Sequence, residues 1–152
     1  MLVFYTMSIV FIVLTGYFFA FPLHKKRPVL IKEDELVVYF VALAVALLQF
    51  FHIWIIVIAV LIILFLYVLK PWFVYGVTRV MLSEALEKAA LATKAPIEKL
   101  ADGYTIDGSI KVKQYNLAEK IIFISFEATN ESKKAKLTMV VYKKFILNYF
   151  TS

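Results

Sequence analysis

The residues LVVYFVALAVALLQFFHIWIIVIAVLIILFLYVL, numbers 36–69, contain no charged side chain over 34 positions. A helix of this length would measure about 51 Å, which exceeds the roughly 30 Å of a bilayer's hydrocarbon core. Tilting absorbs only part of such a difference. The stretch therefore predicts either a tight hairpin of two short membrane spans or one long helix that extends past the bilayer.

The centre of this stretch favours the hairpin. Gln49 and His52 are its only strongly polar residues, and Trp54 beside them is typical of a membrane–water interface. No Gly, Pro or Asn marks a turn, and every residue there can continue a helix, so one long helix stays the alternative. We expect Gln49 and His52 to make polar contacts at the interface or between helices.

A second uncharged run, residues 1–23, is also long enough to span a bilayer. No basic residue precedes it, whereas Lys25, Lys26 and Arg27 follow it, which indicates a retained span with its amino end outside. Three crossings would place the second half of the chain in the cytoplasm, and two would place it outside. Because Lys70 and further basic residues follow the second run, we expect the cytoplasmic placement.

Residues 71–152 predict a small, basic α+β domain outside the membrane. An amphipathic helix is expected over 77–94, where Glu84 and Lys88 would form an ion pair. Alternating apolar residues then predict an antiparallel meander, whose second strand carries apolar side chains on both faces and should lie centrally. The expected elements are a helical turn at 97–103, strands at 109–117, 120–128 and 135–142, and a polar connection at 129–134.

The fold class predicted from these patterns is a membrane α-helical region, with two or three transmembrane helices in residues 1–70, followed by the α+β domain. We expect the residues that mark the membrane boundary to be basic or tryptophan, since both concentrate at interfaces. These residues are Lys25, Lys26, Arg27, Trp54, Lys70 and Trp72.

The sequence holds little catalytic chemistry. The absence of cysteine excludes disulfides, thiol nucleophiles, cysteine-ligated zinc and iron–sulfur clusters. No phosphate-binding glycine loop is present, and neither histidine lies in a metal-binding motif or in residues 71–152. We therefore expect no enzyme activity, no cofactor, no metal and no small-molecule substrate.

The net charge of +6 and the pI of about 9.4 bear on binding partners. Beside a membrane, a basic domain favours contact with anionic lipid headgroups or an acidic partner over contact with nucleic acid. The dense RNA-binding signature of aromatic and basic residues is missing. The residues expected to make such contacts are Lys111, Lys113, Lys133, Lys134 and Lys136.

Three functions fit these observations. The leading hypothesis is a non-catalytic accessory or scaffold subunit of a larger membrane complex, since neither apolar run contains a charged residue and no catalytic constellation is visible. The alternative is a membrane-tethered binding module that recognises anionic lipid or an acidic partner. A third hypothesis is a component of a homo-oligomeric channel or transporter, for which Gln49 and His52 are the only candidate residues.

Overall fold

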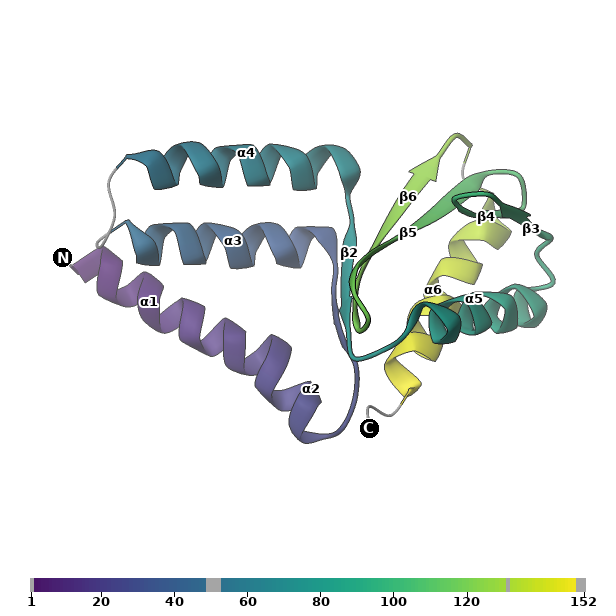
Figure 1. Ribbon diagram of the computed structural model, residues 1–152, viewed down its shortest axis with the longest axis horizontal. Coiled ribbons are helices and arrows are strands. Elements are labelled where there is room, and N and C mark those ends of the chain that lie inside the picture. The colour runs from purple at the N-terminus through teal and green to yellow at the C-terminus, as the bar shows by residue number, and fades with distance from the viewer. Residues whose placement is uncertain (1, 49–52, 131, 150–152) are drawn as a thin grey trace.

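Figure 1 presents the computed structural model, which describes residues 2–48, 53–130 and 132–149. Long helices from the first half of the chain lie at one end of the molecule. A sheet with two covering helices lies at the other end, and the N-terminus is at the end of the helical region far from that sheet.

The first helix runs through α1 (Leu2–Thr15), a π-helical turn η1 (Gly16–Ala20) and α2 (Phe21–His24). Residues Leu2–His24 together form a helix long and apolar enough to cross a membrane, and it is the one such helix in the described part of the chain. None of its residues is buried against the rest of the protein. The helix ends where Lys26 adopts a positive φ of 51° and Pro28 follows.

Residues 36–69 contribute to two helices, α3 (Glu33–Leu47) and α4 (Trp54–Leu69), which lie side by side with opposite directions (Figure 1). Helix α3 starts with three acidic residues, which the positive end of the helix dipole favours. Helix α4 ends at Lys70 in the left-handed conformation. Each helix is about 22–24 Å long, below the thickness of a hydrocarbon core. The structure therefore contains a helical hairpin here, but it does not confirm two further membrane spans.

The sheet has six strands in the order β1-β2-β6-β5-β4-β3, and every neighbouring pair is antiparallel. Strand β6 pairs with β2 on one side and with β5 on the other, which confirms the expected central strand. The strands are β1 (Val29–Ile31), β2 (Trp72–Tyr75), β3 (Ile97–Leu100), β4 (Gly103–Ile106), β5 (Ile110–Ala118) and β6 (Ile121–Ala128).

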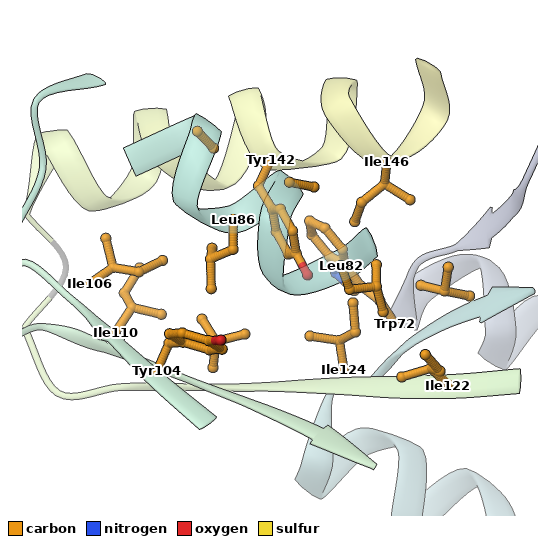
Figure 2. Close-up of a cluster of buried hydrophobic side chains, with 14 of the residues drawn as sticks. Trp72, Leu82, Leu86, Tyr104, Ile106, Ile110, Ile122, Ile124, Tyr142 and Ile146 are labelled. Carbon is orange, nitrogen blue, oxygen red and sulfur yellow. The ribbon is translucent and has the colours of Figure 1, made fainter. Parts of the chain in front are cut away.

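Helices α5 (Arg79–Thr93) and α6 (Lys133–Asn148) cover one face of the sheet. Figure 2 shows Leu86 of α5 and Tyr142 of α6 directed toward the sheet, where Ile122 and Ile124 of β6 complete the core. Helix α5 confirms the amphipathic helix expected near 77–94. The hydroxyl oxygen of Thr78 caps it by accepting a hydrogen bond from the Met81 amide.

Two of the elements predicted for residues 71–152 are wrong. The strand expected over 135–142 is part of α6, whose N-cap Ser132 accepts a hydrogen bond from the Ala135 amide at 3.0 Å. The helical turn expected at 97–103 is the edge strand β3 and the start of β4. The apolar residues of 135–142 are compatible with a strand and with a helix. Burial against α5 and the sheet stabilises the helix.

The sheet also takes a strand from the first half of the chain. Residues 29–31, which lie between the two uncharged runs, form β1 and pair with β2. Trp72, expected at the membrane boundary, is the first residue of β2 and is only 8% exposed. A strand from within residues 1–70 is thus the outer strand of the sheet, next to β2.

Candidate functional site

The strongest candidate for a functional site is the junction between the helical region and the sheet. Its centre is a small apolar cluster that joins β1 to the ends of α3 and α4. Fully or nearly buried members of this cluster are Val29, Ile31, Leu36 and Leu66. Their burial fixes the outer strand of the sheet against the helical hairpin.

Aromatic rings continue this contact across the sheet. The ring of Phe73 in β2 lies 5.4 Å from Phe123 in β6 and 6.0 Å from Phe19 in η1, measured between centroids. Phe19 in turn lies 6.0 Å from Tyr39 of α3. Edge-to-face and tilted contacts of this kind add to the stabilisation from burial. The sheet face opposite α5 and α6 is therefore packed against the helices at its β1–β2 end.

Two hydrogen bonds reinforce the junction. The indole N–H of Trp72 donates to Glu33 Oε2 at 3.0 Å, and the hydroxyl of Ser125 donates to the carbonyl of Leu69 at 3.0 Å. Only Lys32 separates β1 from α3, and only residues 70 and 71 separate α4 from β2. No flexible linker is present at these two connections, so the sheet is held close to the helices.

The basic residues predicted to mark a membrane boundary gather at this junction. Lys25, Lys26 and Arg27 are exposed just beyond α2, and Lys70 is exposed at the end of α4. Trp54 is exposed at the opposite end of α4, at the far side of the helical region (Figure 1). Trp72 is the exception, since its ring packs in the core against Phe126, with centroids 4.6 Å apart.

Gln49 and His52, the predicted helix–helix contacts, lie outside the described residues. Their proposed polar roles therefore stay predictions. The two helices on either side, α3 and α4, place residues 48 and 53 at the end of the hairpin away from the sheet (Figure 1).

The five lysines predicted to contact lipid or a partner do not form one surface. Lys111 and Lys113 lie on β5 and point away from α5 and α6, because their neighbours Ile110, Val112 and Gln114 are buried beneath those helices. Lys133, Lys134 and Lys136 lie on the first turns of α6 and are exposed there. The sheet separates the two groups.

Two surface ion pairs are present among the described residues. Lys113 Nζ lies 2.6 Å from Glu127 Oε1 across β5 and β6, and Lys88 Nζ lies 2.6 Å from Glu84 Oε1 within α5, as predicted. Hydrogen bonding to Glu127 raises the pKa of Lys113 and lowers that of the carboxyl. Both pairs are solvated, so they contribute little to stability.

A cavity of about 310 Å³ opens beside the junction, where α2, β1 and α6 meet. Lys25, Arg27 and Lys143 line it together with aromatic residues of the first helix. Burial, followed by the nearby ammonium of Lys32, lowers the pKa of Lys143. The sequence did not single out Lys143, because nothing local distinguishes it from the many other lysines of the tail.

Gln114 and Tyr142 place polar groups in the core of the domain. The Gln114 side chain and the Tyr142 hydroxyl are buried without a well-formed hydrogen bond in the described structure, and burial raises the pKa of Tyr142 strongly. Among residues 2–48, 53–130 and 132–149, no three His, Asp or Glu side chains cluster as metal ligands would. The candidate sites among the described residues are therefore the junction, the cavity beside it and the exposed surfaces.

Comparison of the chain with protein-family profiles, with curated proteins and with solved structures found no match.

Proposed function

We propose that this protein is a non-catalytic accessory or scaffold subunit of a larger membrane protein complex. The observation that supports it best is the junction, where β1 and β2 continue almost directly into the helices and share an apolar cluster with them. A domain that binds ligands at a distance from its membrane anchor is usually joined to that anchor by a flexible linker. A sheet held close to its anchor suits a subunit that presents a fixed surface to neighbouring proteins.

The membrane topology is part of this proposal. We infer that Leu2–His24 crosses the bilayer with its amino end outside, and that the α3–α4 hairpin enters the same bilayer, with the sheet domain in the cytoplasm. Lys25, Lys26, Arg27 and Lys70 lie at the sheet end of the helices, which agrees with the bias of basic residues toward the cytoplasm. The N-terminus lies at the other end (Figure 1), as an odd number of crossings requires.

The outer face of β5 is the surface that we propose for a partner subunit. Tyr115 is 52% exposed there, on the sheet face that α5 and α6 do not cover. Lys111 and the Lys113–Glu127 pair lie on the same face, so its charge is mainly positive. A partner with an apolar patch bordered by carboxylates would complement this face.

The proposal can be tested by purifying the tagged full-length chain from native membranes in a mild detergent. We expect the wild type to migrate as part of an assembly larger than the monomer. Tyr115→Glu should release the partner, because it places a negative charge at the centre of the proposed contact. Leu91→Glu is the matched control, since Leu91 is 79% exposed on α5, over the opposite face of the sheet.

Two outcomes would contradict the proposal. One is a wild-type chain that leaves native membranes only as a folded monomer. The other is an assembly that Tyr115→Glu and Leu91→Glu weaken to the same extent, since the contact would then not involve the outer face of β5.

A further inference from the structure

The cavity beside the junction has two chemically different parts. The cationic part of its lining consists of Lys25, Arg27 and Lys143, and the aromatic part includes Tyr17 and Phe21 of the first helix. The volume of about 310 Å³ is at the lower end of the range for small-molecule sites. An occupant that matched both parts would carry negative charge at one end and hydrocarbon at the other.

The basic part has an excess of positive charge. Among residues 2–48, 53–130 and 132–149, no carboxylate forms an ion pair with any of its three cations. Glu35 is the one acidic residue in the lining, and its carboxylate accepts a hydrogen bond from the Lys32 amide at 2.9 Å. The Lys32 ammonium lies close enough to Lys143 to lower its pKa, and the Glu35 carboxylate offsets this only in part. An anion in the cavity would relieve this repulsion.

The apolar part opens onto the surface of the first helix. Tyr17 and Phe21 are 67% and 56% exposed, so their rings form a wall that continues along the helix. The Lys25 ammonium lies 4.3 Å from the centre of the Phe21 ring, which brings the cation to the boundary between the two parts. In the proposed topology this boundary coincides with the headgroup level of the bilayer.

We propose that the cavity binds one anionic phospholipid, with its phosphate against Lys25, Arg27 and Lys143 and an acyl chain along Tyr17 and Phe21. Basic pockets at the cytoplasmic ends of membrane helices are suited to such headgroups. Because Lys143 belongs to α6 and Arg27 follows α2, the lipid bridges the sheet domain and the first span. The inference rests on the membrane anchoring in the proposed function, and it does not depend on a partner protein.

The experiment uses the full-length chain, purified in detergent and stripped of lipid, with phosphatidylglycerol or phosphatidylcholine added in native mass spectrometry. We expect one phosphatidylglycerol to bind more tightly than phosphatidylcholine. The double variant Arg27→Gln/Lys143→Gln removes two of the three cations. It should weaken phosphatidylglycerol binding roughly tenfold to thirtyfold, at about 1 kcal/mol for each charge. Lys26→Gln/Lys144→Gln loses the same charge from exposed neighbours that do not line the cavity, and should bind like wild type.

A further variant and a competition experiment with inorganic phosphate also test the proposed lipid site. Lys25→Gln, in an exposed segment where misfolding is not expected, should weaken binding in the same direction if the double variant does not fold. Equal losses in the two double variants would overturn the specific site and leave only general attraction between a basic protein and an anionic lipid. Inorganic phosphate that competed fully with the lipid would overturn the acyl-chain contact and identify a free phosphate site.

This test separates the two proposals. It uses the isolated chain, so loss of a partner protein leaves its outcome unchanged. If the chain binds phosphatidylglycerol as described but never joins a larger assembly, the lipid site stands and the accessory-subunit proposal fails.

Discussion

Helices α4 and α5 use their apolar residues in opposite ways. Helix α5 mixes apolar with charged residues, and five of its fifteen positions are buried against the sheet and α6. Helix α4 has no charged residue, yet among its sixteen positions only Leu66 is buried. An apolar stripe specifies an internal partner, whereas a helix that is apolar on all sides is typical of a membrane span or of the core of a larger structure. The difference separates the part of the protein that folds around its own core from the part whose apolar side chains stay exposed.

The largest expected effect follows from replacing a leucine in each of these helices. Leu86→Ala on α5 leaves a cavity in a fully buried site and should lower the free energy of unfolding by about 2–5 kcal/mol. Leu61→Ala on α4, where the side chain is 61% exposed, should change it by less than about 0.5 kcal/mol. Denaturant unfolding of both variants in detergent measures the difference. Similar losses would show that α4 buries its surface within the protein.

An intermediate effect is expected at the junction between the two parts. Glu33→Ala removes the acceptor of the Trp72 indole N–H and should cost about 1–2 kcal/mol. Asp34→Ala removes an acidic residue from the same first turn of α3, and the side chain of Asp34 is exposed. It therefore controls for the loss of helix-dipole stabilisation. If the two variants were equally stable, the hydrogen bond would contribute nothing to holding the sheet against the helices.

The smallest effect concerns pH. The pKa of Lys143 lies below its unfolded value of 10.5, chiefly because of burial and then the Lys32 ammonium. Between the folded and unfolded pKa values the unfolded chain binds more protons, so this residue makes stability rise with pH in the alkaline range just below 10.5. The gain should stay below about 1 kcal/mol, because the ammonium is largely solvated.

Variants isolate this contribution from that of the other groups. The raised pKa values of Tyr142, Tyr149, Lys88 and Lys113 act with the opposite sign in the same alkaline range, and they do so in every variant. The stability of the wild type relative to Lys143→Gln should therefore rise between about pH 9 and pH 11, whereas its stability relative to Lys144→Gln should stay constant, when unfolding midpoints are compared. A stability difference from Lys143→Gln that did not change with pH would show that Lys143 makes no such contribution. Added phosphatidylglycerol should reduce the rise in the wild type, since a bound anion favours the charged lysine.

Local patterns were enough to predict the elements with a single clear period. The helix near 77–94 has an apolar stripe at helical spacing, and strands near 109–117 and 120–128 alternate strictly or carry apolar residues on both faces. The turn between β4 and β5 also has a local cause, because Asp107 and Gly108 form a dipeptide typical of tight hairpins and both adopt the positive φ that such a turn requires. These features depend on neighbouring residues alone.

Tertiary contacts determine the features that local sequence patterns did not predict, namely α6, β1 and the cavity beside the junction. Ala135, Thr138, Tyr142 and Ile146 are the buried residues of α6, and their spacing is helical, but Thr and Tyr do not stand out as core residues in a sequence. Strand β1 has three residues, and its partner β2 lies beyond both α3 and α4. The cavity beside the junction combines Arg27 with Lys143, which come together only when α6 packs near α2. The sequence therefore indicated basic residues without indicating which of them share a site.

The position of β1 also bears on the order in which the protein is built. Synthesis completes the α3–α4 hairpin before any residue of α5 or the later strands exists, and that hairpin brings residues 29–31 beside residues 72–75. The closure entropy of the long intervening loop is then already offset by helix–helix packing. This early two-stranded ribbon presents the open edge of β2 to β6 when it emerges. The hairpin would thus template the sheet, and the last part of the chain would fold onto the ribbon that β1 and β2 form.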